Sequence, residues 1–239
     1  MNKGGLFIRK PFLYQFMFVN YGETIWSIEN RYVGWSNIPL TKNGVNFAYD
    51  ISCKLKQYNL YPNNIFTSGL QRSIDTSLII KQKLKNIDLP IHSDWTLNDR
   101  HYGTFVGAKK EDIETFDNER IIKELKIYEN TPPIMIELNV VEYPIYENNY
   151  FRQIELVGES YKNVYDRIIP YYSANILPII MQNKLPLIIG SNDLLKVFIK
   201  HVRCLSDEDF NKLDLVDNQI YLITLDNDLK YIRTDQIDI

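Results

Sequence analysis

The chain has 239 residues, 45% of them hydrophobic, and a formal net charge of −3. A chain of this length buries roughly 70–75% of the surface that its unfolded form exposes, which is enough for a packed core. The small negative charge provides no field that would attract nucleic acid or an anionic membrane, so neither is expected as a partner. Cys53 and Cys204 are isolated in the sequence. Without metal-ligand or disulfide spacing they predict free thiols in a reducing compartment and no metal site.

The first segment of the chain is basic and then apolar. Lys3, Arg9 and Lys10 precede an apolar run over residues 13–19. The run is too short to cross a membrane. No small-residue cleavage site accompanies it, so a signal peptide is not expected. We predict that residues 1–13 form an extension, that a buried strand follows, and that the protein is cytoplasmic.

Strand-like and helix-like segments alternate along the rest of the sequence. Apolar runs predict buried strands at 14–19, 65–67, 185–189 and 219–225, with a turn and a further short strand at 229–232. Helical periodicity predicts helices at 41–58, 68–85, 109–129, 159–181 and 192–204, and a short helix at 206–213. Between them, 89–95 should be extended, 97–107 a loop and 134–156 a long connection.

This alternation predicts an α/β fold. We expect a three-layer sandwich in which a mostly parallel central sheet carries helices on both faces. The sequence shows no repeat, low-complexity tract or linker, so we predict a single domain over residues 1–239. Thr41 and Ser206 suit helix N-caps. Pro170 and Pro178 are expected to interrupt the helix at 159–181.

The segment after the first strand carries a specific motif. Residues 17–39 read MFVNYGETIWSIENRYVGWSNIP. Without a gap, they resemble the opening of the cofactor-dependent phosphoglycerate mutases of the histidine phosphatase superfamily, where a strand is followed by L-V-R-H-G-E-S. In this alignment Asn20 stands where the family has a phosphate-neutralising arginine. Tyr21 stands where the family has the histidine that carries the phosphoryl group.

A second segment resembles the other half of the family's catalytic site. Residues 187–197 align with a strand-to-helix turn that reads A-H-G-N-S-L-R-A-L in the family. Ser191 then takes the place of the second histidine, Asn192 of a glycine and Asp193 of an asparagine. The helix N-terminus could still bind an anion, but Asp193 adds a negative charge beside it.

The remaining pocket motifs are closer to the family pattern. Residues 97–103, LNDRHYG, resemble the mutase string L-N-E-R-H-Y-G, which places Asp99 at the general acid/base glutamate. An aspartate is one methylene shorter, and about 1 Å of misplacement can cost about 10²-fold in rate. Leu125 and Lys126 align with two clamp arginines. In total, the resemblance implies substrate contacts at Asn20, Ser27, Gly34, Arg72, Arg100, Tyr102, Lys110, Lys126 and Asn192.

Each of these features also has a purely structural interpretation. The loop at 20–23 can be only a turn, Ser191 can be only a helix N-cap, and Arg72 can be an ordinary surface arginine of a helix. The string RHYG around His101 could be taken for a relocated catalytic motif, but no second histidine matches it. We expect ordinary roles for all three histidines, His92, His101 and His201.

The two substituted positions decide the expected activity. A tyrosine with a pKa near 10 provides little phenolate at neutral pH, and a serine without a paired base is not an activated nucleophile. We therefore predict a phosphoglycerate mutase-like pseudoenzyme with a binding or regulatory role. The alternative is a mutase or phosphatase with residual or altered activity. The family would use 2,3-bisphosphoglycerate, but no cofactor is expected here. Expected partners are a weakly bound phosphorylated small molecule and, in an oligomer, a second copy or an active mutase.

Overall fold

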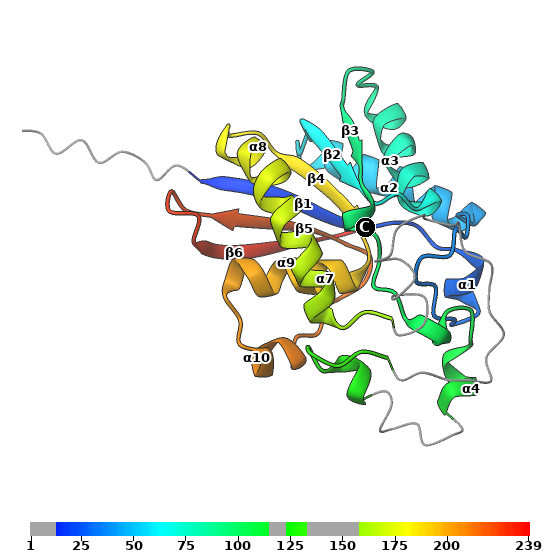
Figure 1. Cartoon of the computed structure of the whole chain (residues 1–239). Coiled ribbons are helices and arrows are strands. Elements are labelled where there is room, and N and C mark those ends of the chain that lie inside the picture. The colour runs from blue at the N-terminus through cyan, green and yellow to red at the C-terminus, as the bar shows by residue number, and fades with distance from the viewer. Residues whose placement is uncertain (1–12, 115–122, 133–157) are drawn as a thin grey trace, which may run out of the picture.

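One six-stranded sheet organises the part of the chain that the computed structural model describes, residues 13–114, 123–132 and 158–239 (Figure 1). The strand order is β3-β2-β4-β1-β5-β6. The strands are β1 (Tyr14–Asn20), β2 (Asn64–Thr67), β3 (Ile91–Ser93), β4 (Pro186–Gly190), β5 (Gln219–Leu225) and β6 (Tyr231–Asp238). The predicted strands are confirmed, although β6 runs six residues beyond its expected end.

The sheet has a parallel part and an antiparallel part. β1 pairs parallel with β4, β4 with β2, and β2 with β3. β5 lies antiparallel to β1, and β6 antiparallel to β5. The central strands are buried on both faces, which explains their continuous apolar sequences. The predicted α/β fold with a mostly parallel sheet is therefore confirmed.

Helices cover both faces of this sheet. Side chains at alternate positions of β1 point to opposite sides. Phe16 and Phe18 pack with the core that α7, α8 and α9 cover, whereas Met17 and Val19 pack with the core under α2 and α3. Figure 1 shows α7, α8 and α9 together on one side of the sheet. The helices are α1 (Ile25–Ile28), α2 (Lys42–Gln57), α3 (Gln71–Leu84), α4 (Lys110–Glu114), α7 (Tyr161–Tyr171), α8 (Leu177–Met181), α9 (Asn192–Arg203) and α10 (Asp207–Asn211).

Several helix boundaries differ from the sequence prediction. Helix α1 was not predicted because four residues are too few to show a period. Helix α3 begins at Gln71 rather than at residue 68. The helix predicted at 109–129 is described only as α4 and as residues 123–126, and the chain has left it by Ile127. Residues 115–122, residues 1–12 of the extension predicted at 1–13, and the connection predicted at 134–156 lie outside the described residues.

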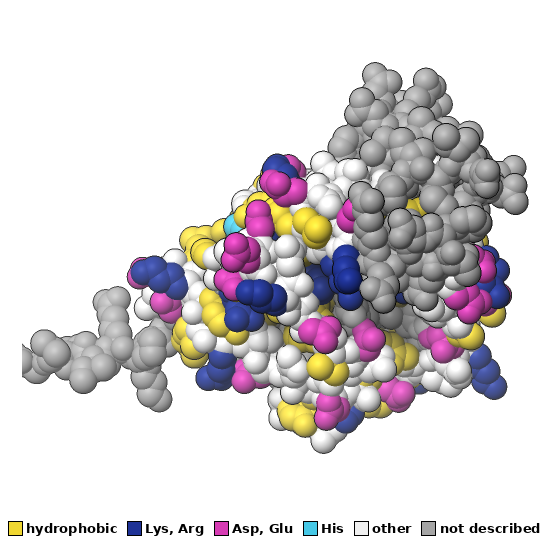
Figure 2. Space-filling model, turned by 90° about the horizontal axis from the view of Figure 1, so that it is seen from below, with side chains coloured by type: hydrophobic (Ala, Val, Ile, Leu, Met, Phe, Trp, Pro, Cys, Tyr) yellow, Lys and Arg dark blue, Asp and Glu magenta, His cyan; other side chains and the backbone are white. Residues whose placement is uncertain are grey.

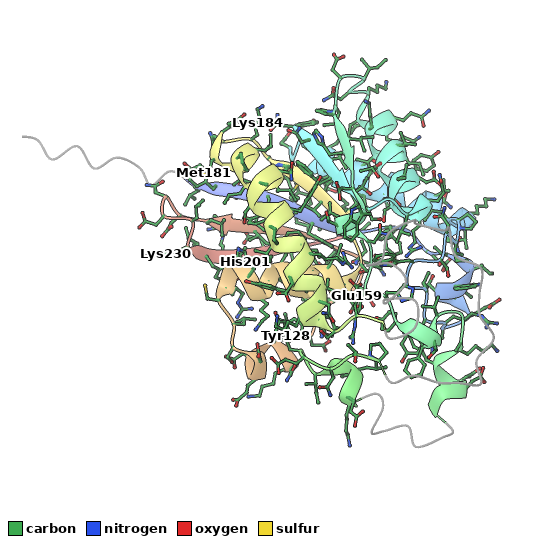
Figure 3. All side chains as sticks on the ribbon, in the orientation of Figure 1. Tyr128, Glu159, Met181, Lys184, His201 and Lys230 are labelled. Carbon is green, nitrogen blue, oxygen red and sulfur yellow. The ribbon has the colours of Figure 1, made fainter. Side chains whose placement is uncertain are left out.

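The predicted break at Pro170 is wrong, and the one at Pro178 takes another form. Pro170 lies inside α7, which continues to Tyr171. A π-helical turn over Tyr172–Ile176 then leads directly into α8, where Pro178 occupies the first turn. A proline in a first turn needs no hydrogen-bond donor of its own. The wider turn before it joins the two helices without ending them. Figure 3 shows Glu159 and Met181 at opposite ends of this joined helix.

The carboxyl ends of the parallel strands meet at one edge of the sheet. Asn20 at the end of β1 is in register with Gly190 at the end of β4, and Thr67 of β2 with Ile189. Sites in open α/β sheets lie at this edge. The loops that follow these strands therefore meet there.

On the face seen in Figure 2, acidic and basic side chains are interspersed. No helix in the described ranges is long and apolar enough to cross a membrane.

Truncating the core beneath α9 should destabilise the fold strongly. Phe198 is fully buried and its ring packs against those of Phe16, Phe18 and Tyr172. We expect Phe198→Ala to lower the free energy of unfolding by about 3–5 kcal/mol. Ile87→Ala, at a side chain that is 84% exposed, should change it by less than about 0.5 kcal/mol. Urea denaturation measures both, and equal effects would contradict this core.

Candidate functional site

Two adjoining hollows lie at the carboxyl edge of the parallel strands. The larger, which we call the outer cleft, has a volume of about 740 Å³. The smaller, the inner cavity, has a volume of about 190 Å³. Tyr21, Ser27, Lys110 and Ser191 line both of them. The loops after β1 and β4 therefore converge as the sequence predicted.

The turn after β1 is held against the start of α2. A Cβ atom on Gly22 would lie 2.2 Å from the carbonyl oxygen of Gly44, so only glycine permits this approach. The Gly22 amide donates to Thr76 of α3 at 3.3 Å. Thr41 caps α2 as predicted and also donates to Glu23 Oε1 at 2.6 Å. These contacts fix the position of the main chain beside Tyr21 and therefore the point from which its side chain extends.

Tyr21 is tied into a buried ion pair. Its hydroxyl donates to Asp99 Oδ2 at 2.7 Å, and Arg72 donates to the same oxygen at 2.5 Å. The side chain of Arg72 is fully buried, and it also donates to the carbonyl oxygens of Gly34 and Ser36, at 2.7 Å each. The guanidinium lies 4.8 Å from the centre of the Tyr21 ring. Arg72 is therefore neither an exposed surface arginine nor one that lines either hollow.

This environment keeps the Tyr21 phenol protonated. Burial, and after it the negative charge of Asp99, raise the pKa of Tyr21 well above its ordinary value of 10.0. A phenol in this state donates a hydrogen bond and is a poor nucleophile. The arrangement can hold a proton between Tyr21 and Asp99, but it cannot supply a phenolate at neutral pH.

The start of α9 is polar and carries one oxygen atom without a hydrogen-bond partner. Ser191 takes the N-cap position with extended backbone, but its side chain makes no capping bond, so the expected side-chain cap is absent. Its Oγ atom is buried without a hydrogen-bond partner. Asn20 donates to Asn192 Oδ1 at 3.0 Å, and Asn192 donates in turn to Asp217. These contacts join the ends of β1 and β4 through amides.

Asp193 places a negative charge in the first turn of α9, as the sequence indicated. Its carboxylate accepts hydrogen bonds from the hydroxyls of Tyr102 at 2.5 Å and Tyr161 at 2.6 Å. Burial and the charge of Asp193 raise the pKa of both tyrosines, so both remain donors. An acidic side chain at a helix N-terminus opposes the binding of an anion there.

The predicted substrate contacts fall into two groups. Asn20, Ser27, Gly34, Tyr102, Lys110 and Asn192 line the outer cleft or the inner cavity, together with Tyr21, Asp99 and Ser191. Arg100 is buried and donates to the carbonyl oxygens of Glu159, Leu125 and Asn130. Lys126 is exposed and lines neither hollow. Arg72 and Arg100 also line neither hollow, but each contacts a side chain that does: Arg72 bonds to Asp99 at 2.5 Å, and the Arg100 guanidinium lies 5.4 Å from the centre of the Tyr102 ring.

A second buried ion pair supports the loop that carries Asp99. Arg167 donates to both carboxylate oxygens of Glu159, at 2.7 and 2.9 Å, and to the carbonyl oxygens of Thr96, Asn98 and Asp99. Figure 3 places Glu159 at the end of α7 that faces this loop. Sequence reasoning missed the pair. Its one signal was that Arg167 lies on the apolar helix face with Val164 and Ile168, where an arginine needs a buried partner.

Each of the three histidines lies outside the two hollows and contacts another polar group of the protein. His92 lies 3.1 Å from Asn64, and His101 accepts a bond from the Gly103 amide at 3.0 Å. His201 lies 2.9 Å from the Tyr165 hydroxyl. None of the three lines the outer cleft or the inner cavity. The part of the chain that the structure describes also contains no group of three or more His, Cys, Asp or Glu that could hold a metal ion.

Comparison with known sequences identifies the family. Residues 16–236 match the sequence model of the histidine phosphatase superfamily (branch 1), so the chain belongs to this superfamily. It is 31% identical over 198 residues to a 2,3-bisphosphoglycerate-dependent phosphoglycerate mutase of Tropheryma whipplei, covering 82% of this chain and 86% of the relative. It is 31% identical over 216 residues to 2,3-bisphosphoglycerate-dependent phosphoglycerate mutase 2 of Bacteroides thetaiotaomicron, covering 88% and 86%.

Solved structures of low sequence identity share the fold. A mycobacterial glucosyl-3-phosphoglycerate phosphatase in complex with VO3 superposes with a TM-score of 0.71 at 16% identity, over 94% of this chain and 98% of the other. A putative α-ribazole-5′-phosphate phosphatase from Escherichia coli superposes with a TM-score of 0.67 at 16% identity, over 95% of each chain. At this identity the likeness establishes the architecture alone.

Removing Arg72 should cost stability rather than only binding. Arg72→Met leaves Asp99 charged and buried and removes the donor to two carbonyls, so we expect the free energy of unfolding to fall by about 3–5 kcal/mol. Arg72→Met with Asp99→Leu should recover part of this loss because no lone charge is left. Arg233→Met, at an exposed pair with Asp235, should cost less than about 1 kcal/mol. An Arg72→Met protein as stable as the wild type in urea would contradict a structural role.

Stability should also fall in mildly acidic solution. Burial lowers the pKa of His201 below its ordinary value of 6.5. The unfolded chain therefore takes up this proton at a higher pH than the folded one. The stability that the neutral imidazole contributes is present above about pH 6.5 and is lost as the pH falls below it. Urea unfolding at pH 7.5 and 5.5 should show a smaller difference for His201→Gln than for the wild type, and an equal difference would refute this assignment.

Proposed function

We propose that this chain is a phosphoglycerate mutase-like protein that has lost phosphoryl transfer and acts by binding. One observation carries the proposal. Tyr21 stands at the position that the alignment gives to the histidine nucleophile. Its hydroxyl is hydrogen-bonded to Asp99, which is paired with Arg72, and the pKa of Tyr21 is raised. At the second histidine position, Ser191 has no paired base. Loss of a covalent nucleophile costs on the order of 10⁶ in turnover in other enzymes.

The cationic groups that would hold a phosphoryl group are also reduced. The two terminal nitrogens of Arg72 donate to Asp99 and to two carbonyl oxygens, and Arg100 donates to three carbonyl oxygens. Leu125, aligned with a clamp arginine, is buried among Tyr32 and Phe105. Each missing charge-assisted bond to phosphate weakens binding by roughly 1.5–3 kcal/mol. The positions of Asn20 and Leu125 alone then account for a loss of about 10²–10⁴ in affinity.

The competing proposal is a mutase or phosphatase with residual activity. The curated relatives at 31% identity are phosphoglycerate mutases, and Asp99, at the general acid/base position, lines the inner cavity. A carboxylate bonded to both Tyr21 and Arg72 is, however, poorly placed to exchange protons with a substrate.

We further propose that the protein is a cytoplasmic binding subunit, which associates with a second copy of itself or with an active mutase.

Phosphoenzyme formation tests the proposal. After incubation with 2,3-bisphosphoglycerate, the wild-type protein should carry no acid-labile phosphate, and its mutase and phosphatase activities should be at background. The triple variant Asn20→Arg, Tyr21→His, Ser191→His should give detectable phosphohistidine, whereas single changes should give none because the groups act as a unit. Asn20→Arg, Tyr21→Gln, Ser191→Gln is the control without imidazoles. A wild-type turnover near ~10 s⁻¹, the typical enzyme median, would contradict the proposal.

A further inference from the structure

The two edges of the sheet differ in length and in exposure. At one edge, β3 has only three residues, which offer little backbone for pairing. At the other edge, β6 has eight residues, and no strand among the described residues pairs with its outer side. Ile232 is 43% exposed there, and the side chains of Arg233 and Asp235 are 57% and 45% exposed. A long open edge strand is a template for pairing with another strand.

The backbone of β6 presents hydrogen-bonding groups to this open side at every second residue. The Ile239 amide donates to the carbonyl oxygen of Asn218 at 3.1 Å, in continuation of the β5–β6 register. In an antiparallel pair, residues that bond to the neighbouring strand alternate with residues whose amides and carbonyls point away from it. Counted back by twos from Ile239, Asp235 and Arg233 bond to β5. Thr234, between them, therefore directs its amide and carbonyl to the open side.

The charges along β6 are complementary to themselves about Thr234. Arg233 precedes this residue and Asp235 follows it, and Lys230 and Asp238 repeat the same order farther out. When a second β6 lies antiparallel with the two Thr234 residues opposite each other, each of these basic residues faces an acidic one. A parallel alignment in the same register would place like charges side by side, which is destabilising. The charge order therefore favours an antiparallel second copy.

Backbone and side chains permit the same register. The outward amide and carbonyl of Thr234 in each copy can form a hydrogen-bonded pair on the two-fold axis. Beside this pair, Arg233 of each copy faces Asp235 of the other. Arg233 and Asp235 already form an exposed pair at 2.8 Å within one copy, which by itself stabilises little. Two copies close these pairs into a ring of four alternating charges, in which neither charge loses its partner.

Other features of the strand limit the pairing to this short region. Moving the two-fold axis to Asp235 would place two carboxylates directly opposite each other, which disfavours that register. The β5–β6 register shifts at Thr224 and Leu225, so close pairing is expected only from Arg233 onward. Lys230 and Asp238 then contribute through charge at longer range. An interface built on so short a region is small, and small interfaces are typical of weak, reversible association.

We propose that β6 pairs antiparallel with β6 of a second copy of this chain, about a two-fold axis at Thr234. The two sheets then continue into one another, and the dimer dissociates on dilution. This inference rests on one part of the proposed function, the association with a second copy, and names the surface that makes it. It does not depend on the proposed loss of phosphoryl transfer.

Sedimentation velocity over a range of protein concentrations tests the pairing. The wild type should change from monomer to dimer as the concentration rises. Arg233→Glu and Asp235→Lys should each weaken dimerisation about tenfold or more, because each change sets like charges opposite each other twice across the axis. The double variant Arg233→Glu, Asp235→Lys should restore it. The matched control is Lys184→Glu, in an exposed loop that β4, β1 and β5 separate from β6, and it should change dimerisation by less than about twofold.

A mixture of the two single variants gives the sharpest result. An Arg233→Glu chain and an Asp235→Lys chain place opposite charges against each other at both contacts, so mixed dimers should form where neither chain dimerises alone. Thr234→Pro removes only an amide that points away from β5. It should therefore abolish dimerisation and leave the urea midpoint of the monomer nearly unchanged.

Two results would overturn the proposal. One is a wild type that stays monomeric up to about 1 mM, which is also the result expected if a strand of another protein occupies this edge. The other is a dimer that the charge variants and Thr234→Pro leave unchanged, which would place self-association on another surface. Turnover of phosphoglycerate by the wild type would refute the proposed loss of phosphoryl transfer, whereas dimerisation that responds to these variants would still support the pairing.

Discussion

The buried ion pair between Arg72 and Asp99 is the interaction on which the geometry of the site depends. It joins α3 to the loop that follows β3, and through the carbonyls of Gly34 and Ser36 it also fixes the segment after α1. Tyr21 at the end of β1 is bonded to the same carboxylate oxygen. A buried charge cannot be left alone without a large cost. The pair therefore holds the walls of the inner cavity in one arrangement.

The same pair changes what the inherited fold can do. Strand ends, a glycine-packed turn and a helix N-terminus still meet at the edge of the sheet. Arg72 faces a carboxylate and Asp193 lies in the first turn of α9, and these charges support the proposed loss of phosphoryl transfer. Enzymes stabilise a charged transition state mainly through donors and charges that are already oriented toward it. On this ground we propose that the site serves binding rather than phosphoryl transfer.

Sequence patterns predicted the parts of the molecule that local physics determines. The apolar runs of β1 and β4 and the amphipathic period of α2 suffice because burial decides them. The edge strand β6 was shortened because residues such as Arg233 and Asp235 do not alternate with apolar ones. The family alignment placed Arg72, Asp99 and Tyr21 at one site, but not their bonding state. That state depends on contacts across 27 residues between Arg72 and Asp99 and 78 residues between Tyr21 and Asp99. Glu159 and Arg167 are only 8 residues apart, but Arg167 also donates to carbonyl oxygens 68 to 71 residues away, which the sequence pattern does not show.

The central claim is that Arg72 belongs to the protein's own ion pair and is not available to an anion. A crystal structure of protein soaked with vanadate tests it most directly, because vanadate mimics a transferring phosphoryl group. We expect the Arg72 guanidinium to stay bonded to Asp99 and to the carbonyls of Gly34 and Ser36, with no vanadate on Tyr21 or Ser191. Vanadate attached to either hydroxyl, with Arg72 turned toward it and away from Asp99, would contradict the account.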